Sequence, residues 1–154
     1  MRYFQISILF YFLLLTISCD SSSKEPTQEQ SIQTFLDEFL IAFNNTQIEK
    51  IDELSASPFV FYVGGKLSEG SSYGAIVDFD AIKKTGWKYT QITSYEIFFE
   101  NELSSQIRLD FSRHNEKDEI LVSSNVIWTL IKEKSKWKLK SAIILDNIVL
   151  AKED

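Results

Sequence analysis

The chain has 154 residues and a formal net charge of −6 at pH 7, from 16 Lys and Arg against 22 Asp and Glu. This acidic balance argues against a nucleic-acid partner, because binding to phosphate requires a basic surface. The chain contains one cysteine, which excludes an internal disulfide.

Residues 1–18 have the pattern of a targeting segment. Arg2 supplies a short positive start, and the run from Ile6 to Ile17 is almost wholly apolar. A membrane-spanning helix needs roughly 20 apolar residues, so this shorter run is typical of the core of a signal peptide. We therefore expect residues 1–18 to be removed, which leaves a chain long enough for one domain of common size.

The apolar run ends in Leu14-Leu15-Thr16-Ile17-Ser18-Cys19, which resembles the lipobox of bacterial lipoproteins. The resemblance implies that Cys19 is lipidated, and two or more acyl chains there would anchor the protein stably. The alternative is an incidental thiol beside an ordinary cleavage site. Residues 19–27 are rich in serine and polar, as expected of a flexible tether. The predicted location is the bacterial cell envelope, lipid-anchored in the periplasm or at the outer membrane.

Residues 28–150 are expected to form the folded domain, which begins with two helices. Residues 27–30 have the Thr-x-x-Gln form of a capping box, and large apolar residues follow at spacings of three and four. This apolar face comprises Ile32, Phe35, Leu36, Phe39, Leu40 and Phe43. A second capping box at residues 46–49 predicts a short helix whose inward positions are 48, 51 and 54.

The middle of the chain is predicted to be less regular. A short apolar strand covers residues 59–63, and residues 66–77 are expected to lack regular structure. Asp80 fits the N-cap of a helical turn over residues 81–85, and Gly86 fits its C-terminal stop.

The C-terminal half reads as four long strands, at residues 90–100, 103–113, 119–132 and 136–146, joined by short polar links. Such links are too short for crossover helices, so neighbouring strands are expected to be antiparallel. Strict alternation predicts one shared face for Thr93, Tyr95, Ile97 and Phe99. In the last strand, it predicts that Trp137, Leu139, Ile143 and Leu145 share one face. The apolar face of this sheet needs a cover, which the helices supply.

This order of elements resembles the nuclear transport factor 2-like (NTF2-like) superfamily, and more narrowly its SnoaL-like domains. The local resemblance lies at residues 79–87, 111–115 and 128–139. It implies an α+β fold in which a curved antiparallel sheet wraps as a cone around a long N-terminal helix, with a cavity between them. The superfamily includes isomerases, cyclases and dehydratases, and also domains that only bind ligands or proteins, so fold does not decide function.

An enzyme of this kind needs a general acid or base in the cavity, and Asp78 and Asp80 are the candidate catalytic residues. Asp80 is also explained by helix capping. His114 lies at a strand end, where a solvated histidine is expected. It is the one histidine in the chain, so no histidine pair can bind a metal. No metal or cofactor is predicted.

The candidate ligand-binding residues are Tyr62, Trp87, Tyr95 and Arg113. Tyr62 and Tyr95 are expected to face inward, although core packing also explains them. Arg113 has the same parity as Phe111, so its side chain is expected to enter the concave layer of the sheet. There it could pair with the carboxylate of a ligand or with an internal acid.

The favoured hypothesis is an envelope-anchored, non-catalytic module that binds a small apolar ligand or a protein. The alternative is a SnoaL-like isomerase or dehydratase that works by general acid–base catalysis. A third hypothesis is assembly through the sheet, either with a second copy as a homodimer or with another lipoprotein.

Overall fold

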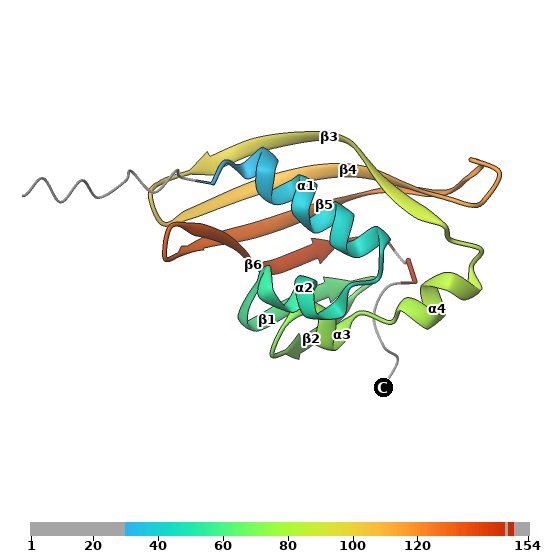
Figure 1. The fold of residues 1–154 in the computed structure, drawn as a ribbon, viewed down its shortest axis with the longest axis horizontal. Coiled ribbons are helices and arrows are strands. Elements are labelled where there is room, and N and C mark those ends of the chain that lie inside the picture. Colours follow the sequence, from blue (N-terminus) through green and yellow to red (C-terminus); the bar gives the residue numbers. More distant parts are fainter. Residues whose placement is uncertain (1–29, 147, 150–154) are drawn as a thin grey trace, which may run out of the picture.

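One helix crosses the inner face of a six-stranded sheet whose strand order is β2-β1-β6-β5-β4-β3 (Figure 1). The computed structural model describes residues 30–146 and 148–149. The predictions for the signal peptide, Cys19 and the tether fall outside these residues. Within the described part of the chain, no helix is both long and apolar enough to cross a membrane.

The first helix, α1, spans Ile32–Asn44 and turns its predicted apolar face to the sheet. Its cap is Ser31, whose hydroxyl accepts a hydrogen bond from the backbone N–H of Thr34 at 3.1 Å. The predicted capping box at residues 27–30 was therefore wrong. Ser31 satisfies an otherwise unpaired backbone donor of the first turn, and the helix begins directly after it.

The second helix, α2, spans Ile48–Glu53 and buries Ile51, with Leu54 buried just beyond its end. The capping box predicted at residues 46–49 was wrong. Thr46 has a φ of 52°, and Gln47 precedes the helix without a side-chain capping bond. Thr46 therefore lies in the tight turn after α1 and does not cap α2.

The segment predicted to be irregular contains a strand and a helical turn. β1 (Ser55–Val63) and β2 (Lys66–Gly70) form a hairpin, and α3 (Tyr73–Ile76) follows. Gly64 and Gly65 have φ values of 53° and 86°, which suits a tight hairpin turn. This hairpin extends the sheet beyond the strands that alternation alone predicted.

The next helix, α4 (Phe79–Lys84), begins two residues earlier than the predicted turn. Its N-cap is Asp78, whose carboxylate accepts a hydrogen bond from the backbone N–H of Ala81 at 2.8 Å. Asp80 lies in the first turn and is exposed, so the prediction of Asp80 as the cap was wrong. Gly86, with a φ of 88°, ends the helix as predicted.

The four predicted long strands are present, with bounds within about two residues of the prediction. They are β3 (Tyr89–Glu100), β4 (Ser104–His114), β5 (Ile120–Glu133) and β6 (Lys136–Ile144). Each pairs antiparallel with the next, as expected. β1 joins β6 in parallel, so the sheet is mixed and not wholly antiparallel.

Bulges overturn the strict alternation predicted for β3 and β6. In β3 the register shifts after Ile92 and again after Ile97, so Ile92 pairs with Phe111 on the inner face while Phe99 pairs with exposed Gln106. In β6 a shift turns Ala142 and Ile144 inward in place of Ile143 and Leu145. An extra residue in one strand moves every later side chain of that strand to the opposite face of the sheet.

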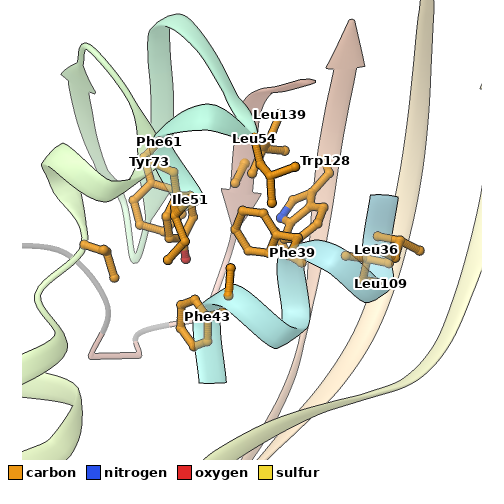
Figure 2. Packing of buried hydrophobic residues seen from close by; sticks show 14 of the residues in the cluster. Leu36, Phe39, Phe43, Ile51, Leu54, Phe61, Tyr73, Leu109, Trp128 and Leu139 are labelled. Carbon is orange, nitrogen blue, oxygen red and sulfur yellow. The ribbon is translucent and has the colours of Figure 1, made fainter. Parts of the chain in front are cut away.

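The aromatic face of α1 packs against the inner face of the sheet. Phe39 lies 4.8 Å from the ring of Trp128 and 5.3 Å from that of Tyr73, measured between ring centroids. Figure 2 shows these rings meeting beside Ile51 and Leu54. Elements from both ends of the chain therefore share one core.

Replacing Phe39 by Ala should lower the free energy of unfolding by about 3–5 kcal/mol, because a buried ring leaves a cavity that the sheet cannot close. Phe99→Ala is the matched control. It removes the same ring from a site that is 46% exposed, and its effect should be about 0.5 kcal/mol or less. Urea unfolding measures both. Equal effects would contradict the assignment of the core.

Candidate functional site

A small cavity of about 50 Å³ lies between α1 and the inner face of the sheet. Phe39 and Phe43 of α1 form one wall, and Leu109 and Trp128 belong to the opposite wall (Figure 2). A volume of ~10–15 Å³ holds one water-sized sphere, so the space admits about three to five non-hydrogen atoms. The polar side chains of the described lining are Tyr73, Thr90 and Arg113.

Arg113 enters the inner layer, as the parity of β4 predicted, and is only 3% exposed. One Nη atom donates a hydrogen bond to the backbone carbonyl of Val149 at 2.6 Å, whereas the buried Nε has no partner. Within the described residues, its guanidinium makes no ion pair with a carboxylate. Burial lowers the pKa of Arg113, with Tyr73 acting weakly in the opposite direction, but an arginine stays charged at neutral pH.

Tyr73 is the functional candidate that the sequence analysis missed. It is 5% exposed and lies against the rings of Phe39, Phe59 and Phe61. Its hydroxyl makes no hydrogen bond with the described residues. Burial raises the pKa of Tyr73 far above its usual value, and the charge of Arg113 opposes this only in part. The phenol is therefore a neutral donor. Tyr73, Ile76 and Val77 are spaced by three and four residues, which is typical of a helical turn. This spacing was the signal that could have identified Tyr73 as an inward-facing residue.

The two predicted catalytic carboxylates lie away from the cavity. Asp78 caps α4, and Asp80 is exposed on the same helix. Neither belongs to the described lining. The structure accounts for Asp78 by its hydrogen bond to Ala81.

Tyr62 was wrongly expected to face inward. In β1 the inner positions are Phe59 and Phe61, so alternation turns Tyr62 to the opposite face, where it pairs with Leu67 and Ile143. Phe61 takes the predicted place of Tyr62 at the cavity wall.

Trp87 is buried but does not line the cavity. Its indole Nε1 donates to the hydroxyl of Thr90 at 2.9 Å, and its ring packs against Phe43 with centroids 5.6 Å apart. Trp87 thus positions Thr90, which lines the cavity.

Tyr95 lies on the inner face opposite Leu109, as predicted, yet it is 39% exposed. It stands in an open groove of about 450 Å³ between α1 and β3. This groove and the cavity share the wall residues Leu40 and Ile92. Tyr95 therefore lines the neighbouring groove, and it does not belong to the described lining of the cavity that includes Arg113.

The prediction of a solvated His114 was wrong, since the side chain is 8% exposed. Its ring stacks on that of Tyr89 at 4.6 Å and lies 2.8 Å from the hydroxyl of Ser112. β4 continues as far as His114, so its strand partner Tyr89 covers it. Among the described residues, no cluster of three His, Cys, Asp or Glu side chains could hold a metal.

No protein-family model and no curated protein matches the chain. A solved protein of unknown function with a cystatin-like fold from Nostoc punctiforme PCC 73102 is 18% identical. The match covers 75% of this chain and 86% of that one, with a TM-score of 0.60. An NTF-2 like protein of unknown function from Shewanella oneidensis MR-1 is 13% identical, with 75% and 96% covered and a TM-score of 0.59.

The chain has an NTF2-like fold. A candidate ketosteroid isomerase from Shewanella frigidimarina NCIMB 400 shares this fold at 14% identity, with 76% and 97% covered and a TM-score of 0.56. At these identities the likeness concerns the fold, and the NTF2-like fold serves both enzymes and binding domains. The residues that line the cavity, and not the fold, therefore distinguish between these functions.

Replacing Arg113 by Met should raise the free energy of unfolding by about 1 kcal/mol, because it removes a buried charge that has no carboxylate partner among residues 30–146 and 148–149. Arg108→Met is the control, since Arg108 is exposed and lies 3.7 Å from Glu96; its effect should stay within about 0.5 kcal/mol. Urea denaturation measures both. A loss of about 3 kcal/mol or more in Arg113→Met would show that the guanidinium is paired within the chain.

Tyr73 should make stability depend on alkaline pH. Below about pH 10 the phenol keeps its proton in both the folded and unfolded chains; above it, only the folded chain does. The wild type should therefore lose about 1.4 kcal/mol per pH unit relative to Tyr73→Phe as the pH rises beyond 10. Urea unfolding at pH 8 to 11 gives this difference. A constant difference would mean that Tyr73 is not buried.

Proposed function

We propose that this protein is a lipid-anchored module of the bacterial cell envelope whose NTF2-like domain binds a small, mainly apolar ligand. The observation that carries the binding proposal is the cavity between α1 and the sheet. Its described lining contains no carboxylate and no imidazole. General acid–base catalysis relies most often on those groups, so this lining favours binding over isomerase or dehydratase chemistry.

The groove beside the cavity supports the same proposal by offering a route of entry. Leu40 of α1 and Ile92 of β3 border both spaces. Both side chains are aliphatic and are only partly buried. A ligand could pass between them without disturbing the aromatic packing at Phe39.

A titration with xenon and with propane, which has three non-hydrogen atoms, tests whether the cavity accepts apolar ligands of the size that it can hold. Methyl resonances of the cavity residues Leu109, Val126 and Ile144 should shift, while those of Ile143, which is 40% exposed, should not. Val126→Phe, which fills the cavity, should abolish the shifts, whereas Ile143→Phe should preserve them. If neither probe moves the cavity methyls, the proposed binding function is wrong.

The anchoring part of the proposal is supported by the apolar run that ends at Cys19. Cells fed an alkyne analogue of palmitate should label the wild type but not Cys19→Ser, since Cys19 is the one cysteine in the chain. The variant should also move from the membrane fraction to the soluble fraction. Unlabelled wild-type protein would contradict lipidation and would leave the cavity proposal intact.

A further inference from the structure

We propose that the cavity takes a small monocarboxylate, with its carboxylate on the guanidinium of Arg113 and its apolar body among the rings of α1 and the sheet. This inference rests on the proposed ligand-binding function and adds the chemical class of the ligand. It starts from a charged side chain that is 3% exposed and lines a cavity whose other described lining residues are all uncharged.

The guanidinium of Arg113 has unused hydrogen-bonding capacity. Its one hydrogen bond to the described residues goes to the carbonyl of Val149, and Nε is buried without a partner. Charged groups are seldom buried unless they are paired. A carboxylate accepts two parallel N–H bonds from one edge of a guanidinium, and the edge that contains Nε has a vacant donor.

The remaining lining limits the charge of the ligand to about one unit. Arg113 is the cation of the described lining, and no lysine or histidine joins it. A phosphate dianion would bring a second negative charge into an apolar site without compensation. Tyr73 and Thr90 supply neutral hydroxyls, and that of Tyr73 makes no hydrogen bond with the described residues. This set of groups fits a carboxylate better than a more highly charged anion.

The volume of the cavity limits the size of the apolar part of the ligand. A volume of about 50 Å³ accommodates a body of about three to five non-hydrogen atoms, as in a short-chain carboxylate such as butyrate. A longer chain would have to pass Leu40 and Ile92 and enter the groove beside Tyr95. Butyrate is therefore the probe of choice, and butyramide is its uncharged isostere.

The competing explanation is an acid of the chain itself. The sequence continues beyond Val149 with Glu153 and Asp154. If one of these carboxylates pairs with Arg113, the site is already filled, and added butyrate should not bind. Wild-type protein distinguishes the two explanations directly.

The test is a titration of the full-length protein with butyrate and with butyramide, followed through the methyl resonances of Leu109 and Val126. Butyrate should bind at least about tenfold more tightly than butyramide, because its hydrogen bonds are charge-assisted. Arg113→Met should abolish this preference. Arg113→Lys should weaken it, because lysine keeps the positive charge but lacks the two parallel N–H donors of the guanidinium. Arg108→Met, at an exposed arginine of the same strand, should retain it.

The outcomes separate this inference from the proposed function. Equal binding of butyrate and butyramide would refute the carboxylate site and leave the apolar binding function standing. A response to xenon without any response to butyrate would likewise refute it and favour an internal acid. If xenon, propane and butyrate all leave the cavity methyl resonances unchanged, both the inference and the proposed function are wrong.

Discussion

The packing of α1 against the sheet is the interaction on which the rest of the structure depends. Phe39 meets both Trp128 and Tyr73, so one ring joins the helix, the sheet and α3. The end of the helix is fixed separately. The side-chain amide of Asn44 donates to the carbonyl of Thr90 at 2.9 Å and accepts from its N–H at 2.8 Å. These two attachments hold the helix over the sheet and define the walls of the cavity.

The electrostatic character of the site follows from this packing. The rings that exclude water also remove the solvent that would otherwise stabilise the guanidinium of Arg113, so the charge interacts strongly with whatever lies beside it. Tyr73 keeps its proton for the same reason. The described lining thus combines one positive charge, on Arg113, with the neutral hydroxyls of Tyr73 and Thr90 in mainly apolar surroundings. Such a site can recognise an anion but has few means of transferring protons.

Periodicity predicted the long elements well because large apolar side chains dominate their burial. The apolar face of α1 was confirmed, and so was the inward position that alternation gave Phe111 in β4. The same alternation placed Arg113 in the inner layer. These inferences depend only on local spacing, which the sequence contains in full.

The errors arose where tertiary structure overrides local spacing. Bulges in β3 and β6 come from the curvature and pairing of the sheet, so Phe99 and Ile143 were assigned to the wrong faces. His114 is buried by its cross-strand partner Tyr89, a contact between residues far apart in the sequence. Tyr73 was missed because α3 is a single turn, too short for a clear helical pattern. The cavity could not be predicted, since it depends on how several elements pack together.

The most direct test of the account is a crystal structure of the mature protein purified from its native host, resolved through residue 154. The account predicts electron density for a small carboxylate molecule within hydrogen-bonding distance of Nε of Arg113, with its apolar part against Leu109 and Trp128. Density showing the carboxylate of Glu153, Asp154 or the chain terminus at that position would contradict it. The arginine would then be a structural partner of the chain's own C-terminal segment.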